Sequence, residues 1–152
     1  MEQFPQITRF RGSGWMDLDS IASVEVSSEE KDYPIESALM LGKRGPWRAA
    51  NPGTQLIRLV FDQPLKIKRI FLAFEDADNA RTQEFVLRWS SDTNSPFREI
   101  VRQQWNFSVP SSVRETEQYS VELLDVKVLE LMIVPDKGGG EVPATLMSLR
   151  LA

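Results

Sequence analysis

A strongly polar stretch of the chain is residues 75–81, which read Glu-Asp-Ala-Asp-Asn-Ala-Arg. Sugar recognition needs planar polar side chains that donate and accept hydrogen bonds in fixed directions. This stretch supplies three carboxylates, an amide and a guanidinium, and we predict as ligand-binding residues Asp76, Asp78, Asn79 and Arg81. The alternative is an ordinary solvated acidic turn. Two carboxylates without further oxygen ligands are a weak indication of a cation site, so we expect no metal there.

A second candidate region is the segment GPWRAANPG at residues 45–53, together with the arginine just before it. Arg44 and Arg48 suit ligand binding because a guanidinium presents a fork of N–H donors to hydroxyls, carboxylates or phosphates. A solvated basic loop is the alternative. Trp47 is either a platform on which a ligand ring stacks or a plug in the core of a β-sheet protein. It joins the two arginines as a candidate ligand-binding residue.

Two residue types are missing from the 152 residues, which contain no cysteine and no histidine. The lack of cysteine excludes disulfides and thiolate catalysis. The lack of histidine removes the usual general base and the commonest transition-metal ligand. An enzyme would have to work with carboxylates, lysine or tyrosine alone. We therefore expect a non-catalytic protein that carries no cofactor.

The net charge is −4 and the sequence pI is about 5.0. Binding to nucleic acid depends on cations that neutralise phosphates, so this charge disfavours a nucleic-acid partner, although it is compatible with a local basic patch. No stretch approaches the ~20 apolar residues that a membrane-spanning helix needs. The first ten residues, MEQFPQITRF, lack the basic and apolar regions of a signal peptide. We expect a cytoplasmic protein with no membrane partner.

The chain length suits one domain, which we assign to residues 1–152. Short apolar runs broken by turn residues about every ten positions are typical of an all-β sandwich or barrel. We predict strands at residues 56–61, 67–74, 84–90, 97–105, 118–124, 128–134 and 144–151. The first two are expected to form a hairpin, which would bring the loops at residues 53 and 75 to one end of the sheet. The one helix predicted is a turn or two at 35–40, and residues 42–53 are expected to be a loop.

The other tryptophans are expected mainly in the core. Trp89 shares the alternating face of its strand with Phe85 and Leu87. Trp105 follows a strand and is a candidate for partial exposure. Trp15 lies in the N-terminal loop and is of a type that stacks on pyranose rings, but core packing is the safer interpretation.

The order of these features resembles a known family. A short helical turn, a tryptophan loop, an apolar strand, a strand ending in Ser-Ser-Asp and a late strand ending in Ile-x-Pro follow one another as they do in the discoidin or coagulation-factor type C family. That family is a galactose-binding-domain-like fold, an eight-stranded jelly-roll β-sandwich. The matching stretches cover most of the chain: Trp47 with residues 55–61, residues 67–72, residues 85–92 with Phe97 and Ile100, and residues 129–135 with 146–151.

A narrower resemblance concerns two stretches, WRAANPGTQLIRLVF at residues 47–61 and EVPATLMSLRL at residues 141–151. Both are similar to the amino-terminal domain of the X-ray repair cross-complementing scaffold protein. That domain is a relative of the same fold, associated with DNA strand breaks and polymerase partners. This resemblance supplies the alternative function, a protein-interaction or DNA-strand-break-binding module.

The resemblance also implies roles for single residues. The family's tryptophan at the position of Trp47 mostly packs at the sandwich edge, so we favour the plug. Glycan-binding relatives often carry Asp-Gly-Asp before it as a calcium loop. Here residues 41–44 read Leu-Gly-Lys-Arg, so we expect that calcium site to be absent. Family members bind glycans, phospholipid headgroups, proteins or DNA. We predict a non-catalytic module that binds carbohydrate through loops at one end of the sandwich, with a protein or, less favourably, nucleic acid as the other partner.

Overall fold

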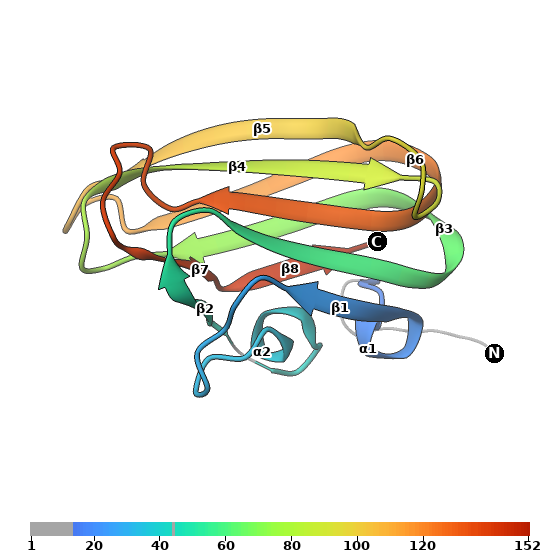
Figure 1. Ribbon diagram of the computed structural model, residues 1–152, viewed down its shortest axis with the longest axis horizontal. Helices are drawn as coiled ribbons and strands as arrows, with labels where there is room; N and C mark the ends of the chain where they lie inside the picture. Colours follow the sequence, from blue (N-terminus) through green and yellow to red (C-terminus); the bar gives the residue numbers. More distant parts are fainter. Residues whose placement is uncertain (1–13, 44) are drawn as a thin grey trace.

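A computed structural model describes residues 14–43 and 45–152, which form an antiparallel all-β sandwich (Figure 1). Two four-residue helices come early in the described chain, α1 (Leu18–Ile21) and α2 (Glu36–Leu39). The strands are β1 (Ala22–Val26), β2 (Trp47–Pro52), β3 (Gln55–Glu75), β4 (Arg81–Ser90), β5 (Arg98–Phe107), β6 (Arg114–Val134), β7 (Pro143–Leu146) and β8 (Ser148–Leu151). The prediction of an all-β sandwich is confirmed.

Two long strands, β3 and β6, connect the two layers of the sandwich. The first half of β3 pairs with the second half of β6, from Gln55 opposite Ile133 onward. The second half of β3 pairs with the first half of β6, ending with Glu75 opposite Arg114. One layer therefore has the order β1-β3-β6-β4-β5, and the other joins β6, β3 and β8. A small separate sheet pairs β2 with β7.

Both long strands bend at the end of the molecule far from β2 and β7 (Figure 1). The register between them shifts on either side of Leu65, close to the exposed Asp62 and Pro64. Proline has no N–H group to donate to a ladder, so it interrupts regular pairing at this point. Strands that change sheet commonly do so through such irregular corners.

The predicted hairpin between residues 56–61 and 67–74 is wrong. The two segments are halves of β3, and each pairs with β6 rather than with the other. Nevertheless, the ends of β3 at Gln55 and Glu75 lie at the same end of the sandwich, because the strand bends and runs back (Figure 1). The loops at residues 53 and 75 therefore meet at one end for a different reason from the one expected.

Other elements also differ from prediction. Residues 118–124 and 128–134 belong to one strand, β6, and helix α1 adds to the single helix expected. The predicted loop at residues 42–53 contains β2, in which burial alternates only from Trp47 to Ala49 before the exposed Asn-Pro pair. A period-two pattern this short, followed by turn-forming residues, resembles a loop in the sequence.

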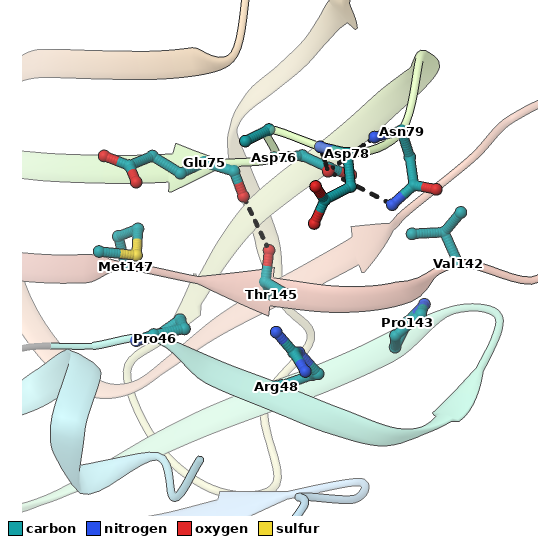
Figure 2. A pocket seen from close by; sticks show the side chains of 11 residues that line it. Pro46, Arg48, Glu75, Asp76, Asp78, Asn79, Val142, Pro143, Thr145 and Met147 are labelled. Atoms are coloured by element: carbon teal, nitrogen blue, oxygen red, sulfur yellow. Dashed lines mark hydrogen bonds between the residues drawn. The ribbon is translucent and has the colours of Figure 1, made fainter. Parts of the chain in front are cut away.

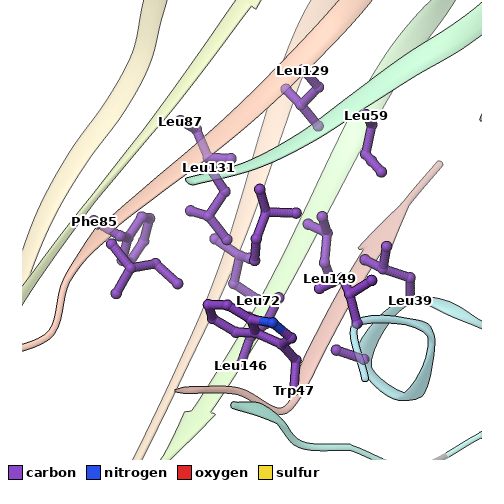
Figure 3. Packing of buried hydrophobic residues seen from close by; sticks show 14 of the residues in the cluster. Leu39, Trp47, Leu59, Leu72, Phe85, Leu87, Leu129, Leu131, Leu146 and Leu149 are labelled. Atoms are coloured by element: carbon purple, nitrogen blue, oxygen red, sulfur yellow. The ribbon is translucent and has the colours of Figure 1, made fainter. Parts of the chain in front are cut away.

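The core fills the space between the layers, and Trp47 lies within it (Figure 3). Its side chain is 0% exposed and its indole Nε1 donates a hydrogen bond to the carbonyl oxygen of Ser28 at 3.1 Å. Figure 3 shows the ring beside Leu146 and Leu72, with Leu39 of α2 nearby. The buried ring with its satisfied N–H confirms the plug interpretation and leaves no exposed face for stacking.

The other aromatic residues pack as the alternation suggests, with one exception. Phe85 is fully buried, whereas Trp89, predicted on the same core face, is only partly buried against it near the end of β4. Trp105 is also partly buried. Trp15 packs against Phe71, with 6.3 Å between the ring centroids. In the described part of the chain, neither helix has the length and apolar character needed to cross a bilayer.

Candidate functional site

A recess of about 430 Å³ opens at the end of the sandwich where β3 ends, between β2, β7 and the loop at residues 75–79 (Figure 2). The loop forms one wall and the paired strands form the other. The lining residues are Pro46, Arg48, Glu75, Asp76, Ala77, Asp78, Asn79, Val142, Pro143, Thr145 and Met147. The recess thus brings together the two polar regions that the sequence indicated.

The pairing of β2 with β7 sorts the side chains of this wall. Trp47 lies opposite Leu146, and Arg48 lies opposite Thr145. Successive side chains of a strand point to opposite faces, so Trp47 and Leu146 enter the core while Arg48 and Thr145 line the recess. The Thr145 hydroxyl donates to the carbonyl oxygen of Glu75 at 3.5 Å, which ties β7 to the end of β3 (Figure 2).

Arg48 is held in place without being enclosed. Its guanidinium lies 4.2 Å from the centroid of the Tyr33 ring, and its Nε is 3.7 Å from a carboxylate oxygen of Glu30. The Arg48 side chain is 36% exposed, and an ion pair this long at this exposure contributes little to stability. Arginine has five N–H donors, so most of its hydrogen-bonding capacity is available to a molecule in the recess.

Asp76 organises the loop rather than reaching into the recess. Its Oδ1 accepts hydrogen bonds from the backbone N–H groups of Asp78 at 2.9 Å and Asn79 at 3.0 Å, and from Asn79 Nδ2 at 3.3 Å. Its Oδ2 accepts a hydrogen bond from Arg81 Nε at 2.6 Å. Burial raises the pKa of Asp76, but the hydrogen bonds from Arg81 and the loop amides outweigh it and hold the pKa below its usual value.

Arg81 lies behind the recess. Its side chain is fully buried, its Nη1 donates to the carbonyl oxygen of Pro135 at 2.5 Å, and its guanidinium lies 4.6 Å from the centroid of the Phe107 ring. Arg81 is not among the residues that line the recess. The reason is that Asp76 and Arg81 form an internal ion pair across the turn, a pairing that a list of polar residues does not reveal.

Four of the predicted residues line the recess, namely Arg48, Asp76, Asp78 and Asn79, and the Asp76 carboxylate is already engaged by Arg81 and the loop amides. Asp78 and Asn79 are exposed at the tip of the loop. Trp47 lies in the core, and Arg44 lies outside the described residues.

The contribution of β7 was not predicted from the sequence. Pro143, Thr145 and Met147 line the recess from the C-terminal part of the chain. The alternation of buried Ala144 and Leu146 with Thr145 is visible in the sequence, but its position beside Arg48 depends on the pairing of β7 with β2. Nothing local to residues 143–147 indicates that partner.

A second recess of about 370 Å³ lies at the other end of β4, where Trp89, Arg98 and Asp125 are among its lining residues. The guanidinium of Arg98 lies over the Trp89 ring, 5.5 Å from its centroid. A side chain of the protein itself therefore already lies over one face of this ring. Across residues 14–43 and 45–152, no group of three or more acidic residues is arranged to hold a metal ion.

The fold is shared with known carbohydrate-binding modules. CpGH89CBM32-5 from Clostridium perfringens, solved in complex with GalNAc-β-1,3-galactose, superposes with a TM-score of 0.63 at 20% identity, over 91% of this chain and 99% of that one. The family 32 module of C. perfringens NanJ, in complex with galactose, gives a TM-score of 0.59 at 14% identity, over 90% and 96% of the two chains. The GH29 fucosidase E1_10125 of Ruminococcus gnavus gives 0.67 at 12% identity, over 90% of this chain and 26% of the enzyme.

No protein-family model and no curated protein sequence matches this chain. At identities of 12–20%, the structural similarities establish the galactose-binding-domain-like sandwich, and they establish the fold alone. The narrower resemblance to the repair-scaffold domain receives no support from these structures.

Proposed function

We propose that this chain is a non-catalytic carbohydrate-binding module that holds a saccharide in the recess between β2, β7 and the 75–79 loop. The observation that carries the proposal is a recess at a loop end of the sandwich in which Arg48, Asp78 and Asn79 keep unused hydrogen-bonding groups. The similar modules that were solved with saccharides support the same class of ligand.

The polar groups match the hydroxyls of a pyranose. Among the described residues, no side chain donates a hydrogen bond to the Asp78 carboxylate, so both of its oxygens are available to accept from two neighbouring hydroxyls. Asn79 uses its Nδ2 on Asp76 and keeps its carbonyl oxygen as an acceptor. Arg48 adds donors from the opposite wall. A few placed polar groups of this kind fix the orientation of a ligand.

The apolar part of the recess is aliphatic. Pro46, Val142, Pro143 and Met147 supply it, and no aromatic side chain belongs to the described lining. The C–H face of a sugar would pack on these residues without aromatic stacking, which lowers the attainable affinity. We expect a dissociation constant for a monosaccharide near ~1 mM, about −4 kcal/mol.

The carboxylates of the recess support binding rather than hydrolysis. Glycoside hydrolases use two carboxyl groups that face the scissile bond. Glu75 is ion-paired with Arg114 and Asp76 with Arg81, which leaves Asp78 as the one unpaired carboxylate in the lining.

The test is a glycan array followed by calorimetric titration of the saccharide that binds. Asp78→Ala and Asn79→Ala should each weaken binding about tenfold, the loss expected for one or two hydrogen bonds to a ligand. The matched control is Asp125→Ala, which removes an exposed carboxylate at the other end of the sandwich and should leave affinity unchanged.

An array without any bound glycan, or equal affinities for all three variants, contradicts the proposal. The same titration with nicked DNA tests the alternative function. A chain of net charge −4 should bind nicked DNA no more tightly than intact duplex at physiological salt. Selective, salt-sensitive binding to the nick would favour the strand-break module instead.

A further inference from the structure

Behind the recess, four side chains form a hydrogen-bonded series that we call the buried polar chain: Asp76, Arg81, Gln83 and Glu115. Arg81 Nε donates to Asp76 at 2.6 Å, and Arg81 Nη1 donates to Gln83 Oε1 at 3.3 Å. Gln83 Nε2 donates in turn to Glu115 Oε1 at 3.2 Å. Gln83 and Glu115 are each 0% exposed. The series therefore connects the 75–79 loop with a carboxyl group in the interior.

Two atoms of the buried polar chain have no hydrogen-bond partner although they are buried. One is the cationic donor Arg81 Nη2, and the other is a carboxyl oxygen, Glu115 Oε2. An unpartnered polar atom in the interior costs free energy. A cationic donor and a carboxyl oxygen in one hydrogen-bonded series are complementary, so the guanidinium has a second possible partner besides Asp76.

The protonation state of Glu115 decides whether that second partner carries a charge. Burial, and then the neighbouring Glu117 side chain, raise the pKa of Glu115 to about 8, against the opposing effects of the Gln83 hydrogen bond and the Arg81 charge. At neutral pH, Glu115 is therefore mostly protonated and uncharged.

The groups around Glu115 come from three further elements besides its own. Strand β6 itself contributes Glu117 and Tyr119, and β4 contributes Arg81. Strand β3 places the apolar Phe74 directly opposite Glu115, and β5 places Phe107 against the Arg81 guanidinium. Among the described residues, the charged groups that act on Glu115 are the Arg81 cation and the Glu117 carboxylate, and Arg81 is also the partner of Asp76.

We propose that the charge on Glu115 controls the order of the 75–79 loop by competing with Asp76 for Arg81. When Glu115 is protonated, the guanidinium is paired with Asp76, which in turn holds the N–H groups of Asp78 and Asn79. When Glu115 is ionised, its carboxylate attracts the same guanidinium and weakens that pairing. The loop then loses its anchor.

A second consequence rests on the proposed function. If a saccharide binds between Asp78 and Arg48, ionisation of Glu115 lowers the affinity of the protein for that saccharide. Bound saccharide must then raise the pKa of Glu115, because the coupling free energy is the same in both directions. We expect a coupling of about tenfold, within the usual range for linked sites.

The coupling is tested without a ligand by carbon-detected NMR titration of the whole chain from pH 6 to pH 10. In the wild type, the carboxyl carbon of Glu115 and the carbonyl carbons of Asp76, Asp78 and Asn79 should titrate with one shared midpoint near 8. In Glu115→Gln, the loop carbons should show no transition there. Glu122→Gln is the control, because it removes an exposed carboxylate from the same strand and should leave the transition intact.

A second variant, Asp76→Asn, changes the other end of the buried polar chain and leaves the Glu115 side chain in place. Arg81 loses its charged partner, so the Glu115 midpoint should fall by about one pH unit, a tenfold change in its ionisation constant. An unchanged midpoint overturns the competition.

The coupling is also overturned if the loop carbons do not follow Glu115, or if their transition persists in Glu115→Gln. Calorimetric titration with a saccharide at pH 6.5 and pH 9.5 then measures whether the affinity for the saccharide falls when Glu115 ionises. Failure of every saccharide to bind at both pH values contradicts the proposed function, while the ligand-free titration still decides the coupling.

Discussion

The two ends of β4 carry similar residue types and use them in opposite ways. At the recess beside the 75–79 loop, the tryptophan is buried in the core and Arg48 and Asp78 face outward. At the far end, Trp89 is partly exposed, but Arg98 covers its ring. A tryptophan beside an arginine is therefore no reliable mark of a ligand site. The two ends differ in how the tryptophan is placed, since Trp47 is enclosed in the core and Trp89 lines the far recess beside Arg98.

The largest expected effect separates the two tryptophans. Trp47→Ala removes a fully buried ring and its hydrogen bond to Ser28, so it should lower the free energy of unfolding by roughly 3–5 kcal/mol. Trp89→Ala removes a partly exposed ring and should lower the free energy of unfolding by clearly less than Trp47→Ala does. Denaturant unfolding followed by fluorescence measures both. Equal losses would mean that the two ends do not differ in packing as described.

The next effect is a pH dependence that belongs to the recess end. The pKa of Glu115 is about 8 in the folded protein, above its ordinary value of 4.5. The folded state therefore keeps a proton that the unfolded state releases, and stability is lost progressively as the pH rises from about 4.5 to about 8. Glu115→Gln cannot ionise and should lack this loss.

Urea unfolding of both proteins at pH 5, 7 and 9.5 measures the difference. The free energy of unfolding of the wild type should decrease with rising pH relative to that of Glu115→Gln. Parallel curves for the two proteins would show that Glu115 does not hold the proton in the folded state.

A smaller difference is expected between substitutions of Arg48 and Arg98, the arginines at the two ends. Arg48→Ala should change the free energy of unfolding by less than about 0.5 kcal/mol, because the side chain is partly exposed and its ion pair is long. It should nevertheless weaken saccharide binding about tenfold through the loss of charged donors. Arg98→Ala should leave saccharide binding unchanged. If Arg98→Ala weakens binding and Arg48→Ala does not, the ligand site belongs at the far end.

The smallest expected effect is that of a chelator. Asp76 is satisfied by Arg81 and the loop amides, and residues 41–43 supply no carboxylate, so EDTA should leave the melting temperature unchanged. Differential scanning calorimetry with and without EDTA makes the measurement. A fall of several degrees that calcium reverses would show that the recess end holds a cation.

Much of the fold could be predicted from local patterns. The alternation of Phe85 and Leu87 identified β4, and the apolar runs at 56–61 and 128–134 identified parts of β3 and β6. The supposed hairpin failed because local apolar runs do not specify their partners, and β3 pairs with β6 about 60 residues further along. Strand β2 was missed because its alternating part is short.

The candidate site, too, could be predicted from the sequence only in part. Residue types in 75–81 and around Arg48 selected the loop wall and the β2 part of the other wall, but not the part that β7 contributes. Their individual roles did not follow from type, because Asp76 and Asp78 are two residues apart and chemically identical. Asp76 turns inward to Arg81 and the loop amides, and Asp78 faces the recess.

The sequence by itself determined the all-β class, the absence of thiol and imidazole chemistry, and the two polar segments that line the recess, because composition and side-chain period are local properties. Tertiary structure alone decided which polar groups remain free. The bend in β3 brings both segments to one end, the pairing of β2 with β7 turns Trp47 inward and Arg48 outward, and β6 places Glu115 behind the loop. Each of these outcomes depends on contacts between residues far apart in the chain, and the free energy of those contacts is invisible to any local pattern.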